Sequence, residues 1–201
     1  MKISQATGDG QQATGKSPPF LLGLVSLSFC LLLTACQALN QPQGLTVSVQ
    51  QVLTGRDIEV TGIVGHPEIT ERVRLEGIDV PDLAQHPWGE AAKNWLKQAI
   101  GNHPVLLESD LEPRDDNGRR LAYLWQNGQL LNEKLVAEGY AIATPHPPNR
   151  KYDQRLARAQ DRARVLGLGI WNPSQPMRLS PGEFRSSKGG GREDGWVDLT
   201  G

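Results

Sequence analysis

Short segments in which apolar and polar residues alternate constrain the fold of this chain more than any other feature of its sequence. Two of them lie within residues 45–62, where the pairs Val47/Val49 and Ile58/Val60 give a two-residue period and residues 54–55 form a turn. This period is typical of β-strands that bury one face. Further strands are expected at residues 73–78, 105–111 and 121–125, the last followed by the tight-turn pair Asn127-Gly128.

Helical spacing of apolar residues appears in three other segments. It predicts a helix over residues 88–100, between the third and fourth strands, and two more over residues 130–138 and 152–166. This order of elements favours an α+β fold that is mainly β, a five-stranded barrel of the OB type with about three helices. The formal net charge is −1, so nucleic-acid binding would have to depend on a local basic patch.

The first 36 residues have the pattern of a lipoprotein signal peptide. Lysines precede an apolar run over residues 20–33, which ends at Leu33-Thr34-Ala35-Cys36. These four residues resemble a bacterial lipobox. The resemblance implies cleavage before Cys36, lipidation of its thiol, and a mature protein anchored to a membrane of the cell envelope, outside the cytoplasm. An ordinary signal peptide, or an uncleaved anchor with an incidental Cys36, is the alternative.

The rest of the chain divides into three parts. Residues 37–44 are polar and are expected to be a linker, and residues 45–172 contain all the periodic segments of one globular domain. Residues 173–201 are rich in Gly, Ser, Pro and charge, a composition that predicts a disordered tail.

Four segments of the domain resemble the staphylococcal nuclease (thermonuclease) family. Residues 73–82 are similar to its arginine strand and the following Asp-Thr-Pro-Glu turn, and residues 115–123 to its second arginine motif. Residues 131–141 match the helix that follows, and residues 169–171 match the closing motif. The four occur in the family's order and spacing, so the chain is identified as a member. Membership implies metal-assisted phosphodiester hydrolysis of DNA or RNA on an OB-fold.

The resemblance also assigns roles to individual residues. Arg74 and Arg119 match the two arginines that hold the phosphate, whose planar donor groups suit phosphate oxygens. Asp79 matches one ligand of a Ca²⁺ ion, and Val80 takes the place of a threonine whose carbonyl binds the metal. Asp82 lies where the family has its glutamate base, so it offers a carboxylate on a shorter side chain. Ion-pair roles for both arginines, and turn capping by Asp79, remain open alternatives.

One position departs from the family pattern. The family has Asp-Gly-Asp-Thr where this chain has Thr54-Gly55-Arg56-Asp57, so Arg56 replaces a calcium carboxylate. The alternation of Ile58 and Val60 supports this alignment, because a shift of one residue would turn every side chain to the other face. Arg56 is therefore expected to face the site, and Asp57 to face away. Arg56 would then form an internal ion pair at the calcium position or contact a phosphate itself.

These departures leave three hypotheses for function. The first is a weak, lipid-anchored nuclease that acts as a monomer on single-stranded DNA or RNA. The second is a catalytically degenerate OB-fold lipoprotein that binds nucleic acid without cutting it. The third is a module that binds an envelope partner. His146 lies in the loop where family members place aromatic rings against bases, and it is a candidate substrate contact or a plain loop histidine.

Overall fold

The computed structural model describes residues 41–63 and 65–189. The predicted signal peptide and Cys36 lie outside the described residues, as does the end of the chain from residue 190. The described residues from Pro42 onward belong to one compact unit. Within the described part, no helix is both long enough and apolar enough to cross a membrane.

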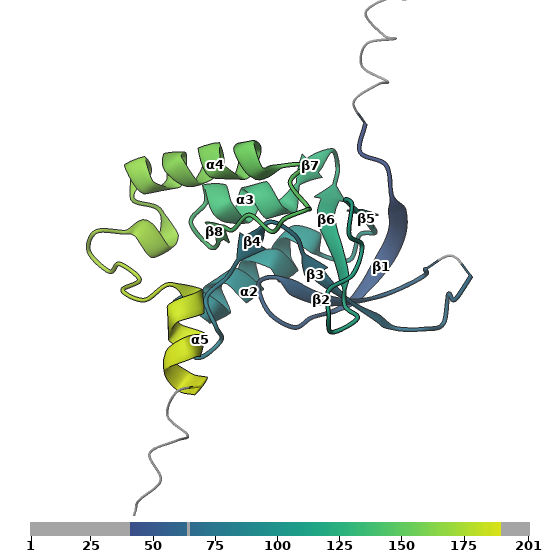
Figure 1. Cartoon of the computed structure of the whole chain (residues 1–201), viewed down its shortest axis with the longest axis horizontal. Helices are drawn as coiled ribbons and strands as arrows, with labels where there is room; N and C mark the ends of the chain where they lie inside the picture. The colour runs from purple at the N-terminus through teal and green to yellow at the C-terminus, as the bar shows by residue number, and fades with distance from the viewer. Residues whose placement is uncertain (1–40, 64, 190–201) are drawn as a thin grey trace, which may run out of the picture. The chain divides into compact units, whose positions relative to one another are not determined.

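Five strands form a closed barrel, as the sequence predicted (Figure 1). Neighbouring strands pair in the order β3-β2-β1-β5-β6, all antiparallel, and a parallel pairing of β3 with β6 closes the sheet. A second small sheet pairs β4 with β8, and β7 extends β6. The bounds are β1 Leu45–Val52, β2 Asp57–Thr61, β3 Glu71–Leu75, β4 Ile78–Asp79, β5 Val105–Glu108, β6 Arg120–Gln126, β7 Gln129–Leu130 and β8 Ile142–Ala143.

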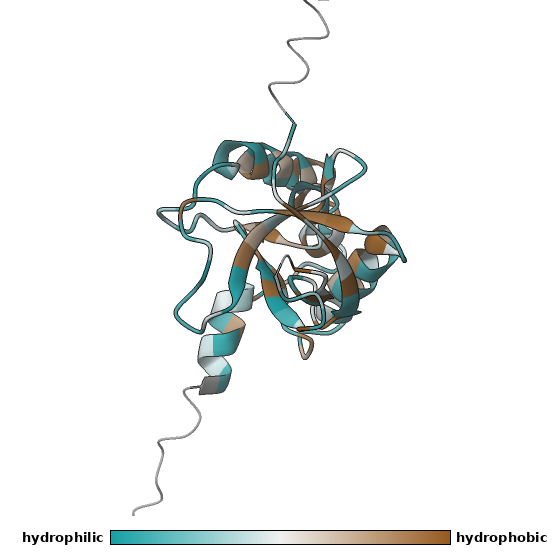
Figure 2. Cartoon of the chain, turned by 90° about the vertical axis from the view of Figure 1, so that its right-hand side faces the viewer, coloured by the Kyte–Doolittle hydropathy of each residue, from teal (hydrophilic) through white to brown (hydrophobic). Residues whose placement is uncertain are grey.

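The two-residue period in the sequence corresponds to the inner and outer faces of the barrel. Val47, Val60 and Val73 are almost fully buried, while their neighbours along each strand are more exposed. Figure 2 shows hydrophobic and hydrophilic stretches alternating on the strands. The pairing of β2 with β3 sets Asp57 opposite Arg74, and this register determines one of the contacts of the candidate site.

Helices cover the barrel and position the loops that follow its strands. Helix α2 (Trp88–Ile100) has the predicted bounds and buries Ala92, Leu96 and Ile100. Helices α3 (Leu131–Ala137) and α4 (Asp153–Leu166) pack against each other, and the short 3-10 helix η1 (Gly169–Trp171) follows. At the start of α2, a Cβ on Gly89 would overlap the carbonyl of Asp82, so glycine allows the loop carrying Asp82 to pack directly on the helix.

The α-helix α5 (Pro181–Gly189) lies where the sequence predicted disorder over residues 173–201. That prediction is wrong for this stretch, and the reason is local. The backbone N–H of Ser180 donates to Glu183 Oε2 at 2.7 Å, and the N–H of Glu183 donates to Ser180 Oγ at 3.2 Å. This reciprocal pair is a capping box, and Pro181 in the first turn lacks only an N–H that would have no helical partner. The polar composition of the segment masked this signal.

Candidate phosphate-binding site

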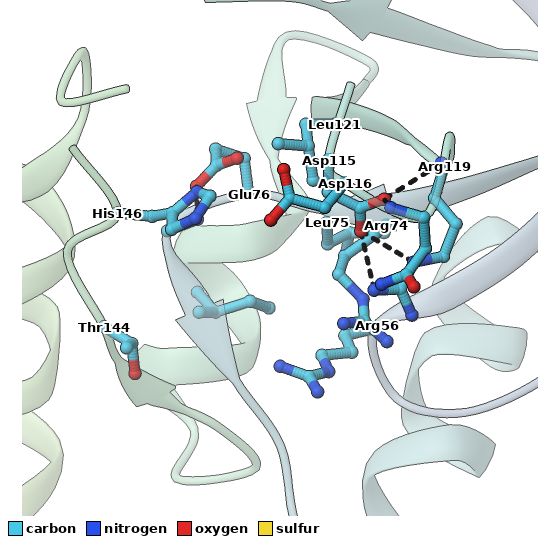
Figure 3. A pocket seen from close by; sticks show the side chains of 13 residues that line it. Arg56, Arg74, Leu75, Glu76, Asp115, Asp116, Arg119, Leu121, Thr144 and His146 are labelled. Atoms are coloured by element: carbon cyan, nitrogen blue, oxygen red, sulfur yellow. Dashed lines mark hydrogen bonds and ion pairs between the residues drawn. The ribbon is translucent and has the colours of Figure 1, made fainter. Parts of the chain in front are cut away.

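A cavity of about 290 Å³ opens beside strands β2, β3 and β6. The β1–β2 turn, β3 with the turn after it, the β5–β6 loop and the segment after β8 all contribute to its wall. Figure 3 shows the arginines on one side of the cavity and His146 with Thr144 on the other. The lining residues are Arg56, Arg74, Leu75, Glu76, Gly77, Ile78, Asp115, Asp116, Asn117, Arg119, Leu121, Thr144 and His146.

Arg74 is held in place by a two-point ion pair with Asp57. Its Nε donates to Oδ1 at 2.9 Å and its Nη2 to Oδ2 at 3.1 Å, as the cross-strand register allows. Thr54 Oγ1 donates to the same carboxylate at 3.1 Å. Burial acts to raise the pKa of Asp57, but the hydrogen bond and positive charge of Arg74 outweigh it and the pKa is lowered. The expectation that Asp57 faces away from the site therefore missed its contact with Arg74, although Asp57 does not itself line the cavity.

Arg56 lines the cavity and forms an ion pair with Asp79. The distance from Arg56 Nη1 to Asp79 Oδ1 is 2.7 Å, and the two side chains are 17% and 10% exposed. Burial lowers the pKa of Arg56, and the negative charge of Asp79 offsets part of that effect. A second guanidinium, that of Arg185 on α5, lies 2.6 Å from Asp79 Oδ2. Asp79 thus sits between two arginines, one of which the sequence did not implicate.

Arg119 comes to the cavity from the β5–β6 loop. Its Nη2 and Nε lie 2.6 and 2.7 Å from Asp115 Oδ2. The other oxygen of Asp115 accepts the backbone N–H groups of Asn117 and Arg119, both at 3.0 Å, which fixes the turn. Burial acts to raise the pKa of Asp115, but the hydrogen bonds and charge of Arg119 outweigh it and the pKa is lowered. Gly118 has a φ of +74° in this turn, a conformation that glycine adopts without strain.

The opposite wall carries a histidine and a buried carboxylate. His146 Nδ1 lies 3.5 Å from Glu76 Oε1, and the histidine side chain is 54% exposed. Glu76 is itself buried and accepts hydrogen bonds from the N–H of Gly77 at 2.9 Å and from Asn149 Nδ2 at 3.1 Å. Sequence reasoning placed His146 in this loop but did not identify Glu76 as its neighbour.

The residues predicted from the family resemblance are therefore only partly brought together. Arg56, Arg74, Arg119 and His146 line one cavity, while Asp79 lies behind Arg56. Asp82 is not among the lining residues: its side chain is 36% exposed and its Oδ1 accepts the N–H of Ala84 at 2.9 Å.

Calcium does not fit the donor set that the described residues present. Calcium takes six to eight oxygen ligands in proteins. Both oxygens of Asp79 already face guanidinium groups, and Lys188 Nζ lies 3.8 Å from Asp82 Oδ1. The Val80 carbonyl would add one neutral oxygen. Among residues 41–63 and 65–189 there is no group of three or more His, Cys, Asp or Glu residues that could hold a metal ion.

Comparison with known proteins agrees with the fold. The model of the family described as "Staphylococcal nuclease homologue" matches residues 72–173. The thermonuclease of Staphylococcus intermedius is 39% identical over 134 residues, which is 64% of this chain and 77% of that protein. The thermonuclease of Staphylococcus hyicus is 35% identical over 132 residues, 63% of this chain and 76% of that protein. Endonuclease YncB of Bacillus subtilis (strain 168) is 30% identical over 142 residues, 67% of this chain and 65% of that protein.

The barrel is an OB-fold domain, and its cavity is lined in part by arginines. The chain belongs to the staphylococcal nuclease family.

Proposed function

We propose that this domain is a nuclease that binds single-stranded DNA or RNA and hydrolyses its phosphodiester bonds slowly, with only a weak response to calcium. Relatives named thermonuclease and endonuclease support the reaction class. The observation that carries the proposal is the ion pair between Arg56 and Asp79 at the wall of an arginine-lined cavity. Arg74 and Arg119, which match the phosphate-binding arginines of the family, line the same cavity, and the Arg56 guanidinium contacts Asp79, the residue that the resemblance implies as a metal ligand.

The arginines account for binding and for part of the catalysis. Asp57 and Asp115 fix the guanidinium groups of Arg74 and Arg119, which reduces the entropy lost when a phosphate binds. Each guanidinium carries five N–H donors, so donors remain for phosphate oxygens after the carboxylate contact. Preorganised donors of this kind stabilise the charge that develops on a phosphate in the transition state.

Two features support slow hydrolysis. Both carboxylate oxygens of Asp79 contact guanidinium groups. Hydrolysis would therefore proceed without the strong positive charge of a divalent ion. The candidate base, Asp82, is half-exposed and lies outside the cavity lining. A misplacement of a reacting group by about 1 Å can cost on the order of 100-fold in rate.

Binding without cleavage is the second candidate function. The position of Asp82 favours it, because a site with placed arginines and no placed base holds a phosphate but does not activate water.

We also propose that the protein acts as a monomer and is anchored through lipidated Cys36 to a membrane outside the cytoplasm, on the sequence pattern alone.

Degradation and binding assays separate these functions. Purified full-length protein is incubated with labelled single-stranded DNA and RNA in calcium and in a chelator, and binding is measured in parallel by fluorescence anisotropy. Slow cleavage with little calcium stimulation is the expected result. Binding without any cleavage would support the second candidate. Fast cleavage that requires calcium would contradict the proposal.

A further inference from the structure

Helix α5 lies outside the region that matches the family, yet it reaches the site. The family match ends at residue 173, and α5 spans Pro181–Gly189. From this helix, Arg185 Nη2 lies 2.6 Å from Asp79 Oδ2, and Lys188 Nζ lies 3.8 Å from Asp82 Oδ1. Asp79 ends β4 and Asp82 lies in the loop that follows, so the helix contacts the stretch that the family resemblance marks as catalytic.

Specific polar contacts fix the segment that leads into α5. Gln85 is buried, its Nε2 donates to the carbonyl of Leu179 at 3.1 Å, and its Oε1 accepts the N–H of Asp82 at 3.0 Å. One side chain thus ties the start of the helix to the loop that carries Asp82. Together with the capping box at Ser180, these contacts define how far Arg185 lies from Asp79.

The charges around Asp79 are unevenly shared. Arg74 binds Asp57 through two hydrogen bonds, and Arg56 Nε lies 4.0 Å from Oδ2 of the same carboxylate. Arg56 shares the single negative charge of Asp79 with Arg185. The three arginines and two aspartates of this group therefore carry 3 − 2 = +1. Without Arg185 the same group would be neutral, and the cavity would attract an anion less strongly.

We propose that Arg185 is a positioning residue that creates a metal-independent phosphate site at Arg56. Arg185 neutralises part of the negative charge of Asp79. Part of the positive charge of Arg56, and several of its N–H donors, therefore stay available to a phosphate of the nucleic acid in the cavity. Two guanidinium groups, one from the β1–β2 turn and one from α5, then provide the positive charge that a divalent cation would otherwise supply. This inference rests on the proposed binding of nucleic acid.

Binding measurements in a chelator test the role of Arg185. The full chain is titrated against a fluorescein-labelled single-stranded oligothymidylate, and affinity is followed by anisotropy. Arg185→Ala should weaken binding by about tenfold, as expected for the loss of one partly exposed charge that neutralises Asp79. Arg185→Lys, which keeps the charge, should recover most of the affinity. The matched control is Arg178→Ala, which removes an exposed arginine just before α5 and should leave affinity unchanged.

A second background separates indirect action from direct contact. If Arg185 acts by neutralising Asp79, then Arg185→Ala should have little effect in a chain that already carries Asp79→Asn. An equal loss in both backgrounds would mean that Arg185 touches the ligand itself, and would overturn the proposal. Tighter binding by Arg185→Ala would overturn it too, because α5 would then be an inhibitory cap.

The wild-type protein distinguishes failure of this inference from failure of the proposed function. Wild-type binding that requires calcium would refute a metal-independent site and leave the nuclease proposal standing. Wild-type protein that neither binds nor cuts nucleic acid, with or without calcium, would overturn both. Melting curves of each variant identify any loss of affinity that comes from unfolding, and Arg185→Gln, which also removes the charge, provides the test if the alanine variant does not fold.

Discussion

Arg56→Asp is the substitution that most directly tests how this site handles charge. It removes the guanidinium that lies 2.7 Å from Asp79 Oδ1 and introduces a carboxylate at the position where the family resemblance implies a calcium ligand. We expect calcium to bind the variant and to increase its cleavage of single-stranded DNA. The wild-type protein should bind calcium weakly.

The magnitude follows from Coulomb's law. A calcium ion bound to Asp79 Oδ1 would lie about 2.4 Å from that oxygen, which also contacts Arg56. The ion and the guanidinium would then be about 4–5 Å apart, and their repulsion would be about 7 kcal/mol at an effective dielectric of about 20. Movement of the Arg56 side chain would relieve much of this energy. We therefore expect calcium affinity to rise by about 100-fold or more in the variant, equivalent to about 3 kcal/mol.

Calorimetric titration with calcium gives the affinity, and melting with and without calcium gives an independent measure, since a ligand that binds only the folded state raises its stability. The matched control is Arg72→Asp, which makes the same charge change at an exposed position of β3. It should not alter calcium affinity. Robust calcium-dependent cleavage by the wild-type protein that Arg56→Asp reduces would refute the reasoning, because Arg56 would then be a working phosphate contact in a metal-dependent site.

Four further outcomes follow from the same contacts. Arg74→Ala and Arg119→Ala should each weaken binding of single-stranded DNA by about 1.5–3 kcal/mol in anisotropy titrations, the usual contribution of one charge-assisted hydrogen bond; unchanged affinity in both would assign them to ion pairs alone. Glu108→Ala should lower the free energy of unfolding by about 2–3 kcal/mol in urea titrations, because this carboxylate accepts hydrogen bonds of 2.7 to 2.8 Å from three side chains. The pKa of Asp57 is lowered in the fold, so its contribution to stability is present above the ordinary value of 3.8 and is lost as pH falls through the lowered value; the stability difference between wild type and Asp57→Asn should therefore shrink with acidification, and a difference independent of pH would contradict this. Cys36→Ser should abolish incorporation of labelled fatty acid in a bacterial host, and equal labelling of both forms would exclude the lipobox.

The strands and helices could be predicted from the sequence because their burial patterns are local. The bounds of α2 at Trp88 and Ile100 coincide with the expected helix, and the barrel strands follow the alternation of valine, leucine and isoleucine. Such periodicity records which face of an element is buried. It carries no information on which residue of another strand lies opposite.

The contacts of the site depend on that missing information. Asp57 binds Arg74 only because β2 and β3 pair in one register. The alternation of buried and exposed residues also gave the wrong orientation for Asp57, because Asp57 is the first residue of β2 and its backbone is hydrogen-bonded to Thr54 in the preceding turn. The N–H of Asp57 donates to Thr54 Oγ1 at 3.0 Å, and Asp57 and Ile58 are both buried. A rule for regular strands fails at such an end.

The C-terminal helix shows why composition misled at the other end of the domain. A segment rich in Gly, Ser and charge has too little apolar surface to fold alone, which is why disorder was expected. Helix α5 instead depends on a capping box and on ion pairs to Asp79 and Asp82, and those acidic groups are in place only after the barrel has formed. The charged residues that argued for disorder are thus the ones that attach the helix. If Arg185 sets the charge at Arg56, the functional domain extends at least to this helix, beyond the boundary at residue 172 that the sequence indicated.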